Sequence, residues 1–582
     1  MITVPWFQIF VGSYIVWVLV ASVSLLLTRR SPTATLAWIF AFIALPVISG
    51  FYYLLFGPRR LQRRKRRYGV ARAMAGSVSA HLRSTSSDHR PKLSREALGL
   101  ASVGKRLGLG EPTFASQVRL LDNGEAKIEA LEHAIRAARH HVHLEYYIWE
   151  PDRIGTHFRD LLVAAARQGV EVRALYDAVG SPKLKPGFWR PLVDAGGEVR
   201  VFNPVGITTG KLHFANFRTH RKIVICDGNV GFLGGINLHD PATQRGAGKD
   251  AWHDQHARID GEPVRKLQRH FLENWTYSGG TFRLTAKSTP FYFPSAKDTT
   301  GGVPTQILAS GPDDETAPLH AFFIAAISIA RHRVWIETPY LVPDEPLEAA
   351  LRIAVLRDVD VQVIVPKQGD SRIVTAASRT YCDALSRAGV HIFEYGPPML
   401  HAKTMVIDDT VAVVGTANLD NRSFRLNFEV AAAFYSLFTG GDLGIALALR
   451  HAREAAKSGR KLLELEYLQG RIAREMDEPD AARRHYRLQI AEFPDAAVTR
   501  LAANELALLL VEKGGSAEEM ADALRALDAA LARTPDEAAL VDTRAQLLQK
   551  MGRRAEALEA MERAHRVEPT DERARLLAAW RA

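Results

Sequence analysis

The chain has 582 residues, of which 47% are hydrophobic and 24% charged, a balance that excludes disorder along the whole chain and allows several folded domains. Lysine and arginine outnumber aspartate and glutamate by 75 to 64, and the net charge of +11 favours polyanionic or anionic-surface partners. The two cysteines, Cys226 and Cys382, are too few for a disulfide framework or a thiolate metal cluster.

Two long apolar stretches open the chain. Residues 1–28 carry no charged side chain, and neither do residues 31–58. A helix needs about 20 mostly apolar residues to cross the hydrocarbon layer, and each stretch supplies them. We predict two transmembrane helices, near 7–27 and 35–56. A cleaved signal peptide is the alternative, but the start lacks a basic region and a small-residue cleavage site.

A strongly basic run follows the second stretch. It consists of Arg59, Arg60, Arg63, Arg64, Lys65, Arg66 and Arg67, whereas the predicted hairpin holds only Arg29 and Arg30. The positive-inside rule therefore places everything after this run in the cytoplasm. Each lysine or arginine near an anionic membrane adds about 1 kcal/mol of attraction. Whether the run binds lipid or only sets the topology stays open. Residues 1–67 form the predicted membrane unit.

A duplicated pattern follows a polar segment, 68–112, that we predict to be a tether. The sequence ARHHVHLE at 138–145 recurs as ARHRVWIE at 330–337. In both copies an apolar helical pattern passes into a β-rich segment, and such alternation predicts an α/β fold with mixed or mainly parallel sheets. The predicted boundaries are 113–285 for a first lobe, 286–299 for a linker and 300–438 for a homologous second lobe.

Three histidines in the first copy have the close spacing of metal ligands. They are His140, His141 and His143, but the second copy keeps only His332. A junction between helix and strand explains them adequately, so we predict no metal site there.

The tail, 440–582, is rich in alanine, leucine, arginine and glutamate. Pro535 and Pro569 are one tetratricopeptide period of about 34 residues apart. Small or apolar residues precede each proline at repeat spacing: Ala523, Leu527 and Ala530, then Ala557, Met561 and Ala564. We predict a tetratricopeptide-like superhelix with a concave face for a protein partner, the alternative being a generic helical bundle.

One motif occurs in both lobes with identical spacing. The first copy consists of His220, Lys222, Asp227 and the segment Gly234-Gly235-Ile236-Asn237, and the second of His401, Lys403, Asp408 and Gly415-Thr416-Ala417-Asn418. Residues two apart on a strand share a face, so each histidine and its lysine project together. Two copies, each with the G-x-x-N extension, are far more specific than a single H-x-K-x4-D.

The doubled motif resembles that of the phospholipase D superfamily, and the flanking segments resemble those of bacterial cardiolipin synthases. These segments are EYYIW at 145–149, WHD at 252–254, TPYLVPD at 338–344, NLDNRS at 418–423 and LNFE at 426–429. The resemblance covers about residues 1–435. It implies two phospholipase D-type α/β lobes that form one active site and need neither metal nor other cofactor. Beyond it, helical repeats replace the family's usual C-terminal helices.

The resemblance also implies roles for the motif residues. His220 would attack phosphorus, and His401 would protonate the leaving alcohol and then deprotonate the incoming one, although the reverse assignment is also compatible. The predicted phosphate-binding residues are Lys222, Lys403, Asn237, Asn418, Gly235 and Thr416. Glu429 and Asp254 would each orient one histidine, a surface salt bridge being the alternative for Asp254. Asp227 and Asp408 complete the catalytic motifs and are expected to stabilise their framework.

The expected protein is a multi-pass enzyme of the bacterial inner membrane with a cytoplasmic catalytic domain. It would convert two phosphatidylglycerols into cardiolipin and glycerol through a phosphohistidine. Expected partners are phosphatidylglycerol, other anionic phospholipids and the membrane, but not nucleic acid. Three alternatives are a phospholipase D that yields phosphatidate, a membrane-tethered HKD nuclease and a non-catalytic scaffold. The position of the basic run argues against a nuclease, and two intact motifs argue against a scaffold.

Overall fold

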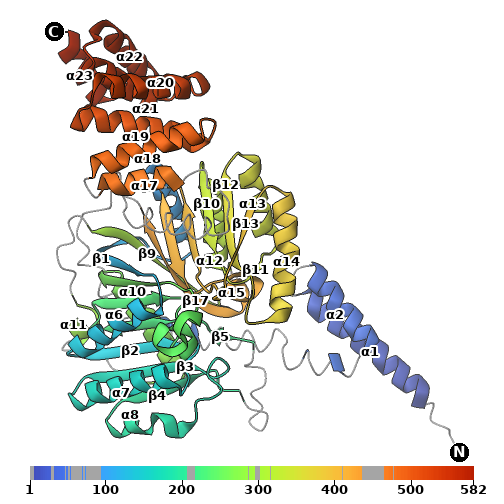
Figure 1. Cartoon of the computed structure of the whole chain (residues 1–582). Helices are drawn as coiled ribbons and strands as arrows, with labels where there is room; N and C mark the ends of the chain where they lie inside the picture. The colour runs from blue at the N-terminus through green and yellow to red at the C-terminus, as the bar shows by residue number, and fades with distance from the viewer. Residues whose placement is uncertain are drawn as a thin grey trace, which may run out of the picture.

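The computed structural model describes residues 6–27, 32–45, 93–205, 216–282, 302–314, 316–408, 410–435, 465–475 and 478–581, with short pieces at 48–49, 53, 68–69, 72–73, 284–285 and 288–294. The basic run at 59–67 lies outside the described residues. Figure 1 shows an α/β body, two N-terminal helices that project from one end of it, and a stack of C-terminal helices at the other end.

One large sheet runs through both lobes. The first half contains β1 (Thr113–Leu121), β2 (His141–Tyr146), β3 (Glu171–Asp177), β4 (Glu198–Phe202), β6 (Ile223–Cys226), β7 (Val230–Gly234) and β8 (His256–Gly261). The second half contains β9 (Val303–Ser310), β10 (Arg333–Glu337), β12 (Asp360–Pro366), β13 (His391–Tyr395), β14 (Thr404–Ile407), β15 (Val411–Gly415) and β17 (Asn427–Tyr435). A separate pair joins β11 (Leu341–Val342) to β16 (Leu419–Asp420).

The strand order is the same in the two halves. It runs β4-β3-β2-β6-β7-β8-β1 in the first and β13-β12-β10-β14-β15-β17-β9 in the second. In each half the three outermost strands are parallel and the others antiparallel. The halves meet where β1 pairs with β9, and β5 (Arg218–Thr219) pairs with β17 across the boundary. The duplication read from the sequence is thus a duplication of strand order within a mixed α/β fold.

Helices cover the sheet because their apolar residues recur at helical spacing. The first lobe has α6 (Gly124–Ala137), α7 (Arg153–Arg167), α8 (Arg190–Asp194), α9 (Gln244–Ala247) and α10 (Val264–Tyr277), and α11 (Thr289–Tyr292) follows. The second has α12 (Pro318–Ile329), α13 (Glu345–Leu356), α14 (Arg372–Arg387) and α15 (Asn421–Arg425). Asn123 and Asp152 cap α6 and α7, each accepting a backbone N–H at 2.9 Å. Ile154, Phe158 and Leu162 form part of the buried face of α7.

A helix occupies part of the segment predicted to be a tether. α5 (Arg95–Arg106) starts at Ser94, whose hydroxyl accepts from the N–H of Ala97 at 3.1 Å. Ala97, Leu100 and Ala101 are buried in the cluster that also contains residues of α12. The tether prediction is therefore wrong over 93–106: the amphipathic spacing is present in the sequence but short, and polar residues surround it.

Tyr68 and Arg72 fix the chain that follows the basic run to both lobes. The Tyr68 hydroxyl donates to Asn274 Oδ1 at 2.8 Å, and its ring lies 5.0 Å from that of Phe428. Arg72 pairs with Asp313 and Asp314, both at 3.2 Å. Burial raises the pKa of Tyr68 well above its ordinary value, so the phenol is neutral. This part of the predicted tether is also attached to the body.

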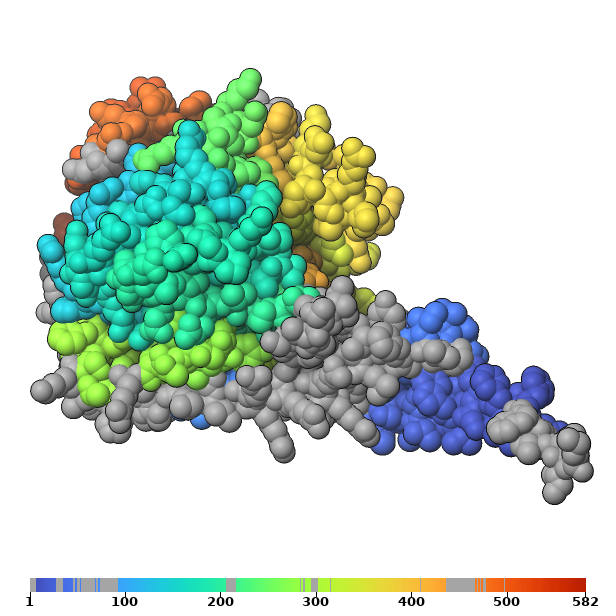
Figure 2. Space-filling model, turned by 90° about the horizontal axis from the view of Figure 1, so that it is seen from below, coloured from blue at the N-terminus to red at the C-terminus, as the bar shows by residue number. Residues whose placement is uncertain are grey.

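The N-terminal helices are apolar. α1 (Trp6–Leu26) contains 20 residues, Phe7–Leu26, with a mean hydropathy of 2.3, and it is the one helix among the described residues long and apolar enough to cross a membrane. α2 (Pro32–Ala44) has 13 residues, and the rest of the predicted second span lies partly outside the described residues. The Phe42 ring packs 5.3 Å from those of Trp17 and Tyr53. Figure 2 shows both helices projecting from the body.

Seven helices are described in the tail. They are α17 (Leu465–Glu475), α18 (Pro479–Glu492), α19 (Ala497–Lys513), α20 (Ala517–Arg533), α21 (Ala538–Lys550), α22 (Arg554–Val567) and α23 (Asp571–Arg581). Pro494, Pro535 and Pro569 follow the ends of every second helix, α18, α20 and α22. The stack touches the second lobe where the Arg500 guanidinium lies 3.3 Å from the imidazole Nδ1 of His332.

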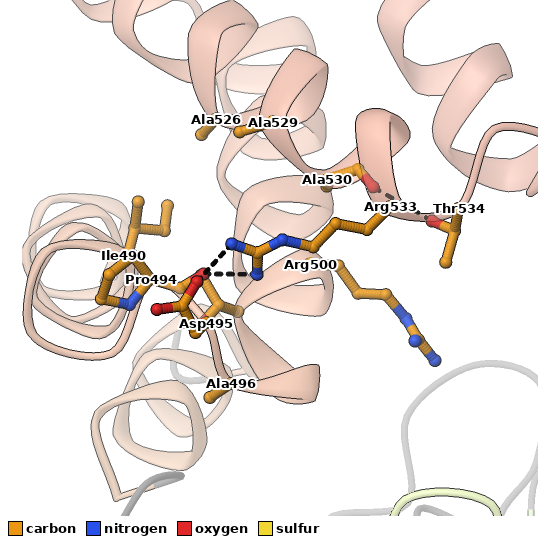
Figure 3. Close-up of a pocket in the computed structure, with 11 residues that line it drawn as sticks. Ile490, Pro494, Asp495, Ala496, Arg500, Ala526, Ala529, Ala530, Arg533 and Thr534 are labelled. Carbon is orange, nitrogen blue, oxygen red and sulfur yellow. Dashed lines mark hydrogen bonds and ion pairs between the residues drawn. The ribbon is translucent and has the colours of Figure 1, made fainter.

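A pocket of about 160 Å³ opens among α18, α19 and α20. Figure 3 shows the Arg533 guanidinium reaching across it to Asp495, and the same group donates to the Pro494 carbonyl at 2.9 Å. Ala526, Ala529 and Ala530, from the same helix as Arg533, also line this pocket.

Candidate active site

His220 lies at the boundary of the lobes, directly after β5, and its partners come from the second lobe. Its Nδ1 is 3.0 Å from Glu429 Oε2 and 3.0 Å from the Thr416 carbonyl oxygen. Its backbone N–H donates to the Phe428 carbonyl at 2.9 Å. Because Nδ1 faces two acceptors, it carries the proton in the neutral ring, and the lone pair is on Nε2.

His401 belongs to the second lobe, and its partners Asp254 and His253 come from the first lobe. Its Nδ1 lies 2.7 Å from Asp254 Oδ2, and its backbone N–H donates to the His253 carbonyl at 2.7 Å. Lys403 Nζ lies 3.0 Å from the same ring nitrogen. Each histidine is thus paired with a carboxylate of the other lobe, so the two motifs converge on one pocket. The exposed fractions of His220 and His401 are only 8% and 6%.

The two motif lysines are buried beside their histidines. Lys222 Nζ donates to the His220 carbonyl at 2.7 Å and lies 5.5 Å from the centre of the Tyr147 ring. Lys403 Nζ donates to the His401 carbonyl. Burial, and then repulsion from Lys403, lowers the pKa of Lys222 to about 7. Burial lowers the pKa of Lys403 to about 8. The pocket therefore holds ammonium groups that lose their protons at or slightly above neutral pH.

The histidines and carboxylates respond to the same environment. Burial is the largest cause that lowers the pKa of His220, and burial followed by Lys403 lowers that of His401 to about 4. Burial alone would raise the pKa values of Glu429 and Asp254, but the neighbouring histidines and lysines lower them overall. At neutral pH the resting pocket holds neutral imidazoles and ionised carboxylates. An anionic phosphodiester entering it would raise the pKa of both histidines.

The predicted phosphate-binding residues divide into two groups. The Asn237 side-chain oxygen accepts from the Ile148 N–H at 3.1 Å, and Asn418 Oδ1 is buried without a hydrogen-bond partner among the described residues. Gly235 already donates its N–H to the Gln255 carbonyl at 2.8 Å. Thr416 donates its N–H to the Val430 carbonyl at 2.9 Å and its hydroxyl to Glu429. The prediction that Gly235 and Thr416 donate hydrogen bonds to phosphate is therefore wrong, because these donors already have acceptors within the protein.

Gly235 and Thr416 occupy equivalent positions in the two motifs, but the room for a side chain differs between them. The Thr416 hydroxyl fills the space beside Glu429, whereas a Cβ at Gly235 would lie 2.1 Å from Asp254 Oδ1. Glycine is required at 235 because the Asp254 carboxylate lies against it.

The motif aspartates lie apart from the histidines, at the far ends of β6 and β14. Asp227 has a left-handed φ of 52° and accepts the backbone N–H groups of residues 139–141 at 2.8–3.0 Å. Asp408, with φ of 48°, accepts those of residues 331–333 at 2.8–2.9 Å. Both hold the start of the neighbouring strand, so we place them in the framework and outside the reacting group.

Three further side chains border the pocket, and the sequence analysis gave none of them a role. The Tyr147 ring lies 4.9 Å from that of His220, and the Trp252 ring 5.1 Å from that of His401. Asn427 donates to Glu429 Oε1 at 3.0 Å. All three lie in segments that carry the family resemblance, which was the signal available for them.

The clustered histidines of β2 have protein partners. His141 Nε2 lies 3.3 Å from Gln268 Oε1, and His143 Nδ1 lies 2.9 Å from the Gln268 amide nitrogen. Among the residues that the structure describes, no group of three or more histidine, cysteine, aspartate or glutamate side chains could hold a metal ion.

Comparison with known proteins agrees with this geometry. A family model described as "Cardiolipin synthase, PLD-like domain" matches residues 131–275 and 323–437. The cardiolipin synthase of Alkalihalophilus pseudofirmus is 38% identical over 408 residues, which make up 70% of this chain and 80% of the relative. This chain belongs to the cardiolipin synthase family.

One further family member and one solved structure are also similar to this chain. Cardiolipin synthase 1 of Bacillus anthracis is 36% identical over 421 residues, 71% of this chain and 82% of its own. The crystal structure of phosphatidylserine synthase from Haemophilus influenzae Rd KW20 has a TM-score of 0.49 and 14% identity, and the match covers 61% of this chain and 91% of that chain.

Proposed function

We propose that the protein is a membrane-anchored phosphatidyltransferase that converts two phosphatidylglycerols into cardiolipin and glycerol. The observation that carries this proposal is the exchange of carboxylates, which pairs Glu429 with His220 and Asp254 with His401 across the lobes. Two imidazoles in one pocket can supply both a nucleophile and a proton carrier. Membership in the cardiolipin synthase family supports the choice of lipid phosphodiesters as substrates.

In the first half-reaction, His220 Nε2 forms a bond to the phosphorus of one phosphatidylglycerol. The bond from phosphorus to the glycerol oxygen breaks, and protonated His401 gives its proton to that oxygen. Free glycerol leaves, and a phosphatidyl-histidine remains. Lys222 and Lys403, with the side-chain amides of Asn237 and Asn418, would stabilise the charge on the non-bridging oxygens.

In the second half-reaction, a glycerol hydroxyl of another phosphatidylglycerol enters. His401, now neutral, takes its proton as the oxygen bonds to phosphorus and the bond to His220 breaks. The product is cardiolipin. Water in place of the second lipid would give phosphatidate from the same intermediate, so hydrolysis is the second outcome for which this pocket has the chemistry.

The hydrogen bonds favour His220 as the nucleophile. Its Nδ1 faces two acceptors, Glu429 and Thr416, which leaves the Nε2 lone pair free to attack. His401 Nδ1 faces one acceptor, Asp254, and one donor, Lys403. Such a mixed environment suits a ring that changes its protonation state during turnover.

We further propose how the membrane helices and the C-terminal helices are arranged around the two catalytic lobes. Helices near 7–27 and 35–56 would span the inner membrane, and the basic run 59–67 would hold residues 68–112 and the lobes, 113–285 and 300–438, on the cytoplasmic side. The helices of 440–582 would form tetratricopeptide-like repeats that bind a protein partner. The pocket beside Asp495 and Arg533 is a candidate contact for that partner. Removing 440–582 should leave phosphatidyl transfer intact if the repeats only recruit.

Product analysis tests the reaction. The full-length protein in phosphatidylglycerol liposomes should form cardiolipin and glycerol in equal amounts by mass spectrometry, and His220→Ala should form neither. Phosphatidate as the main product would show that the enzyme is a hydrolase and not a transferase. If a folded protein formed neither cardiolipin nor phosphatidate, the proposal that it acts on phosphatidylglycerol would be wrong.

A leaving group that needs no proton tests the assignment of the two histidines. With a phosphatidyl nitrophenyl ester, His401→Ala should still release nitrophenol in a first turnover, because His401 serves that step only as an acid. His220→Ala should release none, because the nucleophile is missing. The opposite pattern would reverse the assignment.

A further inference from the structure

Two equivalent loops border the catalytic pocket, one in each lobe. The first follows β3, and the second follows β12, the strand at the same place in the second half of the sheet. Asp177, at the end of β3, accepts from Arg218 Nε at 2.9 Å and from the Thr219 N–H at 3.0 Å, so it fixes the two residues directly before His220. After β12, Asp370 accepts the Tyr340 hydroxyl at 2.6 Å, and its charge acts on Lys403.

One exposed aliphatic side chain lies in the first loop, and another lies directly after the second loop. Val179, in the loop after β3, is 41% exposed. Ile373, in the first turn of α14, is 84% exposed, more than any other large hydrophobic side chain among the described residues. Exposure alone does not mark a binding surface, because single exposed aliphatic side chains are common. Val179 and Ile373 are set apart by their loops, whose aspartates act on the catalytic motifs, and by the charge near them.

Basic residues lie close to both aliphatic side chains in the sequence. Lys183 and Lys185 follow Val179 and are exposed, and Lys183 pairs with Glu150 at 2.8 Å. In the second lobe, Lys367, Arg372 and Arg379 are exposed close to Ile373 in the chain, and Asp370 is the acidic residue in the same loop. An aliphatic tip with a surplus of positive charge around it is suited to the interfacial layer of an anionic bilayer.

We propose that the loops after β3 and β12 contact the bilayer, with Ile373 and Val179 entering the head-group layer. The catalytic residues next to these loops would then lie close to the lipid surface. This inference rests on the proposed function, because it supposes a substrate drawn from that surface. A lipid surface is favoured over a protein by the position of α1 and α2, which lie on the same side of the body as α14 in Figures 1 and 2, while the C-terminal stack lies at the opposite end.

The chain offers a matched control for Ile373. Leu356, at the end of α13, is 81% exposed, nearly as much as Ile373. α13 precedes β12 and α14 follows it, so the two side chains lie at opposite ends of that strand. Leu356 is therefore at the edge away from the pocket, and the proposal predicts that it stays in water.

Spin-label accessibility measures the contact without reference to activity. A nitroxide is attached at Ile373→Cys or Leu356→Cys in the full-length Cys382→Ala protein, in vesicles of phosphatidylglycerol and phosphatidylcholine. Cys226 is buried, and burial raises the pKa of its thiol, so it resists labelling. At 373 the label should be reached well by oxygen and poorly by a water-soluble nickel complex, and at 356 well by the nickel complex.

The other accessibility results would overturn the proposal. Equal access of the nickel complex at both positions would mean that Ile373 faces water. Poor access of both reagents at 373 would mean that a protein surface, such as a second copy of the chain, covers it.

Turnover provides the second measurement. Ile373→Asp should lower phosphatidylglycerol turnover in vesicles about tenfold, because a charge replaces a side chain that enters the bilayer. Turnover of a water-soluble short-chain phosphatidylglycerol should be unchanged. Leu356→Asp should stay within about twofold of the parent on both substrates. Equal losses on both substrates would contradict the membrane contact. If the parent itself makes no lipid product, the proposed function fails, and the accessibility result still decides whether these loops bind the bilayer.

Discussion

Replacing Gly235 by alanine tests whether the approach of Asp254 to His401 matters for catalysis. The added Cβ would lie 2.1 Å from Asp254 Oδ1 and 2.7 Å from Oδ2, well below the 3.0 Å that real Cβ contacts respect. The Gly235 N–H is bonded to the Gln255 carbonyl, which limits how far the backbone can retreat. The Asp254 carboxylate must therefore move, and its 2.7 Å contact with His401 Nδ1 must lengthen or break.

The size of the effect follows from this displacement. Bringing the closest contact to about 3 Å requires a movement of about 1 Å, and a misplacement of that size costs on the order of 10²-fold in rate. We expect kcat to fall about 10²-fold with KM little changed, because in the proposed mechanism Asp254 orients the acid and does not hold the phosphate. Stability should fall by about 1–3 kcal/mol from overpacking.

The assay measures cardiolipin formation in liposomes for Gly235→Ala beside Gly187→Ala, whose Cβ would meet nothing within 4 Å. Circular dichroism and thermal melting establish that both variants are folded. The loss should largely disappear in the first turnover of the nitrophenyl ester, which needs no acid. Full cardiolipin synthesis by folded Gly235→Ala would refute the reasoning, and so would an equal loss on both leaving groups.

Three further outcomes are expected. Because the pKa values of Lys222 and Lys403 are lowered to about 7 and about 8, their positive charge is lost as pH rises through this range, so kcat/KM for phosphatidylglycerol should fall above about pH 8; a flat profile to pH 9 would contradict the proposed contact with phosphate. Asp408→Ala should destabilise the protein by about 2–4 kcal/mol, because three backbone N–H groups lose their acceptor, while the folded protein keeps its turnover; loss of turnover at unchanged melting temperature would argue for a chemical role. Tyr68→Phe should cost about 1–2 kcal/mol in thermal unfolding through the lost bond to Asn274, and an unchanged melting temperature would show that this bond is dispensable.

The sequence predicted features that depend on local periodicity or on repetition. Alternation of helix and strand indicated the α/β fold, and the repeated segments at 138–145 and 330–337 became the equivalent strands β2 and β10. Spacing of two residues placed His220 and Lys222 together. These signals work because neighbours along a strand or helix have fixed geometry.

Long-range contacts were beyond such reasoning. The pairing of His220 with Glu429 spans 209 residues, and that of His401 with Asp254 spans 147, so only family resemblance pointed to these carboxylates. The donors of Gly235 and Thr416 were misassigned because the sequence does not tell which carbonyl a buried N–H will meet. α5 was missed because its apolar face is short and much of its burial comes from α12, more than 200 residues later.

The attachment of Tyr68 limits how far the lobes can lie from the N-terminal helices. Fourteen residues separate Tyr68 from Tyr53, which packs against the N-terminal helices. Fully extended, this segment spans at most about 50 Å. With these helices in the membrane, as proposed, so short a connection would fix the effective concentration of lipid at the active site by geometry and not by expression level. For the proposed reaction, the density of phosphatidylglycerol in the surrounding leaflet, and not the number of enzyme molecules that find the membrane, would then govern the rate.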